Sequence, residues 1–258
     1  MRTILGPNYG PVTAQKTIGN SNYNALQANL RLAMGKNLTV FLGYTYSKSI
    51  DDASNLGEQV NPFNDRLTRV ISSWDMTHNF VATYNYTLPF DHIFRRNRVT
   101  EGWSLSGTTR FSTGFPVTLS DDSDNSLLGT LGNGVNNQLL DTPQLSEGPL
   151  QINRNPRNGQ SAFNTSLFST ETLGVLGNSP RRFFHGPGIS NFDVQISKNV
   201  RLTESKSIDI RVEAFNLFNH AQFYGPTSVN GKIDDPNFGN VVSAAAPRLV
   251  QVAAKVHF

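Results

Sequence analysis

Polar and apolar residues alternate with a period of two in seven separate stretches of the chain. The clearest stretch, residues 79–88, places Phe80, Ala82, Tyr84, Tyr86 and Leu88 on one face and mostly Asn and Thr on the other. Such alternation is typical of a β-strand with one apolar and one polar face. The other stretches are residues 23–34, 38–47, 103–112, 191–200, 207–214 and 249–258. Each is about ten residues long, which suffices for a tilted strand to cross a bilayer.

The connections between these stretches alternate in length. Residues 35–37, 89–101 and 201–206 form the shorter connections, and residues 49–75, 113–190 and 219–248 form the long ones. Outer-membrane barrels have this asymmetry, with short periplasmic turns and long extracellular loops. The sequence therefore predicts an all-β fold, an antiparallel up-and-down meander of about seven strands. We expect it to be part of a larger transmembrane β-barrel, with residues 1–21 ending a preceding extracellular loop.

Aromatic residues fall near both ends of the predicted strands. If the last strand ends in the periplasm, every long connection lies outside the cell. Amphipathic rings are stable at head-group depth, so two girdles are expected. The predicted girdles consist of Tyr46, Phe80, Phe111 and Phe192 at the outer interface, and of Tyr86 and Trp103, with Phe90 and Phe258, at the periplasmic interface.

Four charged residues fall on the polar, lumen-facing side of two neighbouring predicted strands. They are Asp193, Asp209, Arg211 and Glu213. The favoured interpretation is a cross-strand charge ladder that holds the barrel wall together. The alternative is that these side chains contact a plug or a polar solute in the lumen.

Composition narrows the class of protein. Hydrophobic residues make up 37% of the 258 residues and the mean hydropathy is −0.34, which excludes a bundle of membrane helices. Only 16% of the residues are charged, and the absence of cysteine removes disulfides and thiolate chemistry. The net charge of +3 without a long basic run gives nucleic-acid binding no support. A soluble extracellular β-sandwich or lectin-like binding domain fits the same composition and stays as the alternative.

Motifs for catalysis and metal binding are sparse. The five histidines are scattered, and neither an HExxH nor a GxSxG motif is present. The paired carboxylates Asp51–Asp52 and Asp234–Asp235 lie in loops, where nothing in the sequence indicates a water-excluding pocket. Residues 121–126 are rich in oxygen ligands but lack the spaced acidic ligand of a calcium loop. We expect neither an enzyme nor a cofactor, although an enzyme built into a barrel is a second alternative.

Several short stretches carry a family resemblance. They are YTYSKSIDDA (44–53), SWDMTHNFVA (73–82), GWSLSG (102–107), STGFPV (112–117), GPG (186–188), NFD (191–193), EAFNLFNH (213–220) and the closing Phe258. Together and in this order they resemble the Oar-like branch of TonB-dependent outer-membrane receptors, in which a carboxypeptidase-regulatory-like domain precedes a plug and a barrel.

This resemblance implies a barrel of about 22 strands, of which residues 22–258 would be the C-terminal part. It implies import of an unidentified solute, with TonB acting only through a plug that this chain lacks. The chain also starts without a signal peptide, so its expected place in the outer membrane makes it a fragment or a misplaced start. Its last strand resembles the signature that the barrel-assembly machinery recognises. The residues of that predicted signal are Val250, Val252, Ala254, Val256 and Phe258.

Overall fold

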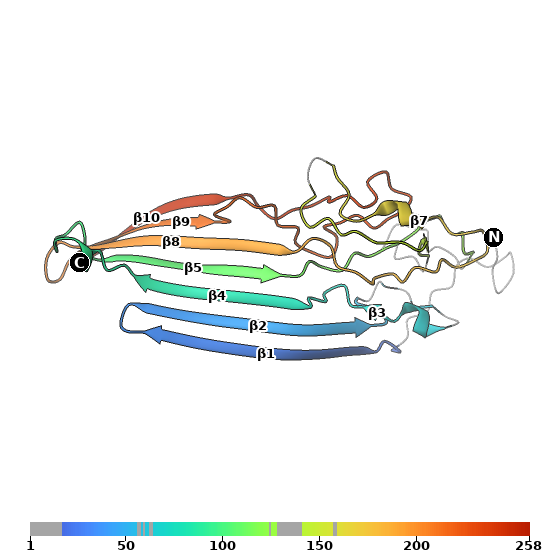
Figure 1. Cartoon of the computed structure of the whole chain (residues 1–258), viewed down its shortest axis with the longest axis horizontal. Coiled ribbons are helices and arrows are strands. Elements are labelled where there is room, and N and C mark those ends of the chain that lie inside the picture. Colours follow the sequence, from blue (N-terminus) through green and yellow to red (C-terminus); the bar gives the residue numbers. More distant parts are fainter. Residues whose placement is uncertain are drawn as a thin grey trace.

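A computed structural model of the chain describes residues 17–55, 58, 60–61, 64–123, 125–127, 141–156 and 159–258. Its main element is one antiparallel sheet in which sequential long strands pair, shown in Figure 1. The long strands are β1 (Ser21–Met34), β2 (Leu38–Asp51), β4 (His78–Thr87), β5 (Trp103–Ser112), β8 (Ile189–Arg201), β9 (Ser207–Phe215) and β10 (Leu249–His257). The predicted all-β meander is confirmed, and the sheet is not closed into a barrel.

The minor elements lie in the connections. They are the short strands β3 (Val70–Ile71), β6 (Gln144–Leu145) and β7 (Phe168–Ser169), the 3-10 helices η1 (Asp65–Thr68) and η2 (Thr165–Leu167), and the α-helix α1 (Phe90–Ile93). β3 extends the sheet beside the end of β2, while β6 and β7 form a separate two-stranded sheet. No helix among the described residues has the length and apolarity needed to cross a bilayer.

The register of the strands places apolar residues of all seven on one face. One row across the sheet consists of Leu32, Val40, Tyr84, Gly107, Val194, Ala214 and Val250. The next row consists of Ala33, Thr39, Asn85, Ser106, Gln195, Glu213 and Gln251. Because adjacent residues in a strand point to opposite faces, these rows lie on opposite sides of the sheet. We call the two sides the apolar face and the polar face.

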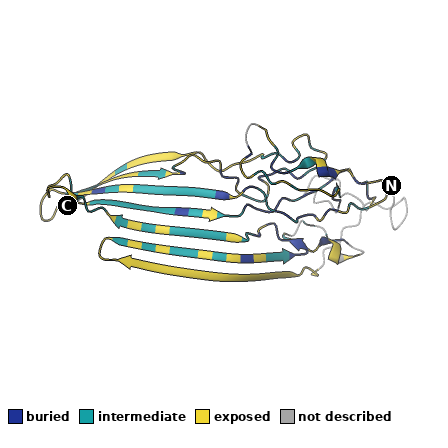
Figure 2. Cartoon of the chain, in the orientation of Figure 1, coloured by how far each residue is buried: buried dark blue, intermediate teal, exposed yellow. Residues whose placement is uncertain are grey.

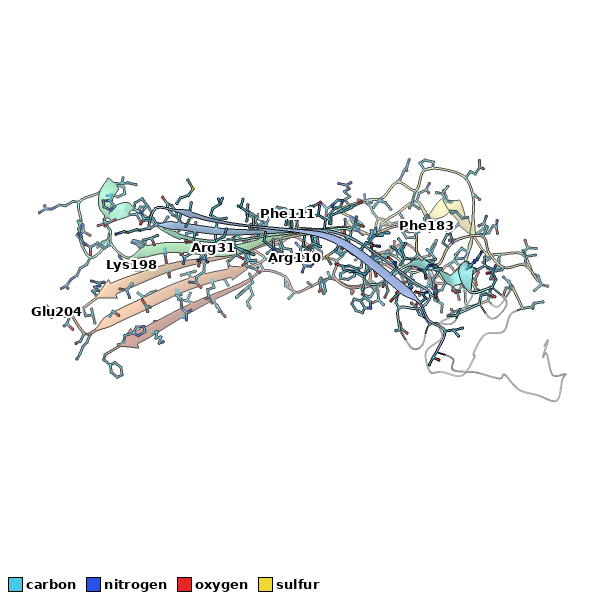
Figure 3. All side chains as sticks on the ribbon, turned by 90° about the horizontal axis from the view of Figure 1, so that it is seen from below. Arg31, Arg110, Phe111, Phe183, Lys198 and Glu204 are labelled. Atoms are coloured by element: carbon cyan, nitrogen blue, oxygen red, sulfur yellow. The ribbon has the colours of Figure 1, made fainter. Side chains whose placement is uncertain are left out.

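No other layer of the described residues covers the apolar face. Many of its large side chains are exposed, among them Leu26, Leu30, Val212 and Val252. Figure 2 shows β1 and β10, the two outermost strands, exposed along most of their length. In Figure 3 the neighbours Arg110 and Phe111 of β5 project to opposite sides of the curved sheet. An uncovered apolar surface of this extent requires an apolar surrounding rather than water.

The strands β1 and β2 are longer than expected. Each has 14 residues, and their pairing runs from Met34–Leu38 to Ser21–Asp51. At about 3.3 Å per residue they exceed the thickness of the hydrocarbon core, even when tilted. The hairpin therefore continues beyond the membrane into the region of the long connections, which Figure 1 shows gathered at one end of the sheet.

The long connections fold together instead of forming open loops. We call their described parts, residues 52–77, 113–188 and 219–248, the cap. Its buried core consists of Val117, Leu119, Ala162, Phe163, Leu167, Phe168, Phe184 and Val229. The ring of Phe163 lies 5.0 Å from that of Phe184 and 5.5 Å from those of Phe168 and Phe238. Long connections at this end of the sheet were predicted from the sequence, whereas the hydrophobic core within them was not.

Candidate functional site

The four predicted ladder residues lie on the polar face, but they contact mainly other residues and not one another. The only ion pair among them is within β9, where Arg211 Nη1 lies 3.8 Å from Glu213 Oε1. Glu213 also accepts a hydrogen bond from the amide of Gln251 on the neighbouring strand β10. The contacts between strands are therefore made through neutral amide groups as well as through charges.

The other two carboxylates have separate partners. Asp209 accepts from the Asn199 amide, and its Oδ2 lies 2.7 Å from His257 Nε2. Asp193 Oδ1 accepts a hydrogen bond of 2.8 Å from the backbone N–H of Asn216, just beyond the end of β9. The carboxylates on the polar face thus already accept hydrogen bonds from neighbouring groups. Such a surface is compatible with contact with water in a barrel lumen.

The outer aromatic residues form a near-continuous band on the apolar face. Ring centroids lie 6.4 Å apart for Phe80 and Phe111, 5.4 Å for Phe111 and Phe192, and 4.9 Å for Phe192 and Phe218. Tyr46 packs at 5.2 Å against the ring of His78 on β4. Sequence reasoning missed Phe218, because it follows β9 and has no alternating neighbours there.

The aromatic residues at the opposite end also lie on the apolar face. Tyr86 pairs with Leu105, and Trp103 pairs with Lys198. The ammonium group of Lys198 lies 5.1 Å from the centre of the Trp103 ring. This contact keeps a cation beside an aromatic ring at the end of the strands, where head groups begin.

A buried ionic network joins two of the long connections. The Arg182 side chain is fully buried, and its Nη1 and Nη2 donate to the two oxygens of Glu58 at 2.5 Å and 2.9 Å. Its Nε donates to the carbonyl oxygen of Ile71 at 2.8 Å, and Nη2 donates to Ser54 Oγ at 3.0 Å. Asp51 Oδ1 lies 3.6 Å away. Arg182 thus fixes the β2–β4 connection against the β5–β8 connection.

Arg181 extends this network. Its Nη2 donates to the carbonyl oxygen of Asp52 at 3.0 Å and lies 3.5 Å from Glu58 Oε2. Burial acts to raise the pKa of Glu58, but the Arg182 hydrogen bond and the charges of Arg181 and Arg182 outweigh it and lower the pKa overall. Burial lowers the pKa of Arg181. The Asp51–Asp52 pair is therefore part of a network with arginines, in which Asp51 lies near Arg182 and Asp52 pairs with Arg69.

A second buried contact lies between the same connections, nearer the sheet. The Asp75 carboxylate accepts from the backbone N–H of Ser49 at 2.5 Å and lies 2.8 Å from His185 Nε2 and 3.4 Å from Lys48 Nζ. Burial acts to raise the pKa of Asp75, while the His185 and Ser49 hydrogen bonds and the Lys48 charge lower it overall. The ionised carboxylate thus holds three segments of the chain together.

Three acidic side chains gather inside the cap. Asp121, Asp141 and Glu171 are 0%, 3% and 4% exposed. Burial and the neighbouring carboxylates of Asp121 and Asp141 raise the pKa of Glu171 to about 7. Asp121 Oδ1 accepts from the backbone N–H and the hydroxyl of Ser123, so it closes a turn. Asp124, which belongs to the oxygen-rich stretch 121–126, lies outside the described residues.

The described part of the chain contains no group of three or more acidic or histidine side chains placed to hold a metal ion. His185 and His257 contact carboxylates, and His78 lies 2.8 Å from the Tyr44 hydroxyl. These histidines come from different parts of the sheet and cap. Each of these contacts joins side chains of different strands or connections.

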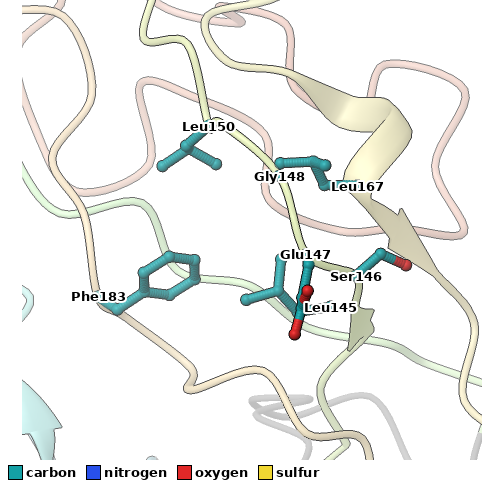
Figure 4. A pocket seen from close by; sticks show the side chains of 7 residues that line it. All are labelled: Leu145, Ser146, Glu147, Gly148, Leu150, Leu167 and Phe183. Atoms are coloured by element: carbon teal, nitrogen blue, oxygen red, sulfur yellow. The ribbon is translucent and has the colours of Figure 1, made fainter.

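A shallow groove opens on the cap surface, as Figure 4 shows. Its volume is about 290 Å³, and its lining consists of Leu145, Ser146, Glu147, Gly148, Leu150, Leu167 and Phe183. The lining is mostly apolar with one carboxylate, that of Glu147.

The predicted signal residues lie on the last strand. Val250, Val252, Ala254 and Val256 of β10 pair with apolar residues of β9 on the apolar face. Phe258 follows the strand and is 92% exposed. β10 pairs only with β9 among the described strands, so its second edge offers free backbone groups.

A single sheet with an uncovered apolar face, a polar face and all long connections at one end has the architecture of a membrane β-barrel wall. Residues 2–251 match the family model described as outer membrane beta barrel domain, and the chain belongs to that family. Its location is therefore the outer membrane. Searches of curated proteins and of solved structures found no match.

The family and the sheet together disfavour the soluble alternative. A β-sandwich buries one face of each of two sheets, and the long strands here form one sheet with no second sheet against it. The only second sheet in the described residues is the short β6–β7 pair in the cap. The extracellular sandwich or lectin-like interpretation is therefore not supported.

Proposed function

We propose that this chain forms the C-terminal part of the barrel wall, and part of the outer surface, of a TonB-dependent receptor that binds and imports a solute. The observation that carries the proposal is the folded cap beside one end of a sheet whose other features are those of a barrel wall. The resemblance of residues 44–53, 73–82 and 213–220 to Oar-like receptors supports the TonB-dependent class. The proposal contains no catalytic step and no cofactor.

The division of work follows from the faces of the sheet. The apolar face contacts outer-membrane lipid, and the polar face lines the path of the solute with amides, hydroxyls and the carboxylates of Asp193, Asp209 and Glu213. The cap supplies recognition, because its arginine network and hydrophobic core hold its surface in one arrangement. Energy from TonB reaches the solute through a plug supplied by another part of the receptor. The barrel-assembly machinery is the proposed partner of β10 during insertion, by β-augmentation at its free edge.

The test is an uptake experiment in the native host. Cells with the intact receptor are compared with cells in which residues 114–188 are replaced by a short Gly-Ser linker, at equal surface amounts of receptor. Depletion of solutes from the medium is followed by mass spectrometry, with and without a protonophore. We expect the intact receptor to deplete at least one solute, and both the loop replacement and the protonophore to abolish this. Depletion that persists with the protonophore would show a passive pore instead.

A further inference from the structure

The connection between β4 and β5 folds back onto the apolar face of the sheet. The ring of Phe90, in α1, lies 6.4 Å from the ring of Trp103 in an edge-on contact. Trp103 Nε1 donates to the carbonyl oxygen of Val99 at 2.7 Å, and Lys198 Nζ donates to the same oxygen at 2.9 Å. Trp103 and Lys198 both belong to the apolar face. In Figure 3, α1 lies on the same side of the sheet as Phe111.

This connection exposes large apolar side chains beside cations. Ile93, Phe94 and Val99 are 66%, 62% and 74% exposed, because no element of the described chain covers them. Arg95 and Arg98, also exposed, make no ion pair among the described residues. We call residues 90–101 the interfacial segment.

The carboxylates near these cations are fewer than the arginines. Arg96 pairs with Glu101, and Asp91 lies 3.9 Å from His92 Nε2. The backbone carbonyl of Glu101 accepts from Lys198, which adds a further cation at the base of the segment. The interfacial segment therefore keeps an excess of positive charge directly beside its apolar side chains.

The depth of the segment follows from the sorting of the connections. It lies at the end of the sheet where the short connections are, which is the periplasmic side of an outer-membrane barrel. The face it occupies is the one that contacts lipid. Its exposed rings and aliphatic chains are thus placed at the inner-leaflet boundary, and its arginines are placed at head-group depth.

We propose that the interfacial segment binds the phosphate group of an anionic phospholipid in the inner leaflet of the outer membrane. Arg95 and Arg98 contact the phosphate, while Phe94 and Val99 enter the upper part of the acyl region. A guanidinium group matches phosphate oxygens in geometry and charge. A protein in the periplasm would meet the end of the sheet, whereas this surface faces the membrane. The segment thus anchors the wall at a fixed depth.

The test measures lipid binding by the intact outer-membrane protein that carries this chain, purified in zwitterionic detergent. Phosphatidylglycerol and phosphatidylcholine with identical acyl chains are titrated, and native mass spectrometry counts bound lipids. We expect phosphatidylglycerol to bind more tightly. Each arginine near an anionic surface increases the binding affinity about fivefold. Arg95→Gln with Arg98→Gln should therefore lower the affinity for phosphatidylglycerol roughly 25-fold and leave the affinity for phosphatidylcholine unchanged.

The matched control removes cations from a different connection at the same end of the sheet. Arg201→Gln with Lys206→Gln changes the net charge equally, in the β8–β9 connection, and keeps the affinity for phosphatidylglycerol. Arg95→Lys with Arg98→Lys keeps most of the preference and shows that the protein remains folded. Equal losses in the glutamine variant and the control would overturn the proposal, as would an unchanged affinity in the glutamine variant or equal binding of both lipids.

Discussion

Arg182 and Glu58 are 124 residues apart in sequence, and the buried guanidinium of one makes two hydrogen bonds to the carboxylate of the other. Replacing Arg182 by Met removes both of these hydrogen bonds and leaves the buried carboxylate with only Arg181, 3.5 Å away, as a cation, which costs up to about 3–5 kcal/mol. We expect the β2–β4 connection to detach and to become sensitive to protease on the cell surface. Time courses of surface proteolysis on intact cells measure this.

The double variant Arg182→Met with Glu58→Met removes both charges and should recover much of the lost protease resistance. Arg154→Met changes an exposed arginine in the same long connection and serves as the control. If Arg182→Met is cleaved no faster than Arg154→Met, the network does not hold the two connections together.

Glu171 makes the stability of the cap depend on pH. Its pKa is raised to about 7 from an ordinary value of 4.5, so the folded cap binds this proton more tightly than the unfolded chain does. The resulting stabilisation is complete below about pH 4.5 and is lost as the pH rises to 7. Glu171→Gln should make the urea midpoint of the cap less dependent on pH between 5 and 8.

Trp74 packs edge-on against Phe115 in the cap, so its fluorescence can report this transition. Glu147→Gln, at an exposed carboxyl, is the matched control and should keep the dependence of the parent protein. A parent midpoint that rises from pH 5 to pH 8 would contradict the assignment of this proton to Glu171.

Gly107 is a position where a side chain does not fit. A Cβ added there would lie 2.5 Å from the carbonyl oxygen of Asp193 and 2.7 Å from the Tyr84 hydroxyl oxygen. Gly107→Ala should therefore destabilise the wall by about 1–3 kcal/mol, as overpacking does. Gly43→Ala is the control, because its nearest neighbour would be Asn29 Oδ1 at 3.3 Å. Urea unfolding in detergent micelles compares them, and equal midpoints would show that β5 and β8 can move apart at little cost.

The two faces of the sheet predict opposite tolerance of charge. Val252 and Ile210 are exposed on the apolar face, and arginine at either position should cost about 2–4 kcal/mol near the membrane midplane. Arginine at Gln251, which lies opposite Glu213, should be much milder. Folding yields in lipid vesicles measure the difference. Similar yields for all three variants would mean that the faces are assigned the wrong way round.

The free edge of β10 predicts a role for Phe258 in assembly. If the assembly machinery reads this strand, deletion of Phe258 from the receptor should slow insertion and leave protein to be degraded in the periplasm. If the ring only anchors the strand at the interface, insertion should be normal and stability slightly lower. Pulse-chase measurement of insertion distinguishes these results, and normal kinetics would remove the signal role.

The wall of the protein could be predicted from the sequence because its environment differs on the two sides. Residues 79–88 alternate with Val81 as the one exception, and β4 spans His78–Thr87, a shift of one residue. Residues 103–112 coincide with β5. Each strand has one face toward lipid and one toward the lumen, so the alternation within its own sequence is enough to predict it. The pattern also fixes which residues of neighbouring strands share a face, but a slip of two residues keeps the same faces, so the exact register needed the structure.

The cap could not be predicted in the same way. Val117, Phe163 and Val229 meet in one core, but they are far apart in sequence and lie in segments without regular periodicity. One indication of the arginine network was present in the sequence, because Arg181 and Arg182 are adjacent in a chain with few charged residues. Its partner Glu58 lies more than 120 residues away, and only the folded connections bring the charges together.

The placement of the long connections at one end of the sheet also determines which parts of the chain can change in length. Ser112 and Ile189 pair where β5 ends and β8 begins, so the connection between them lies outside the paired part of the wall and its length is not set by the register. The β1–β2 turn at the opposite rim has no such freedom, since only three residues join the two strands. One wall of this design can thus carry outer connections of different length and sequence while the same scaffold stays in the lipid.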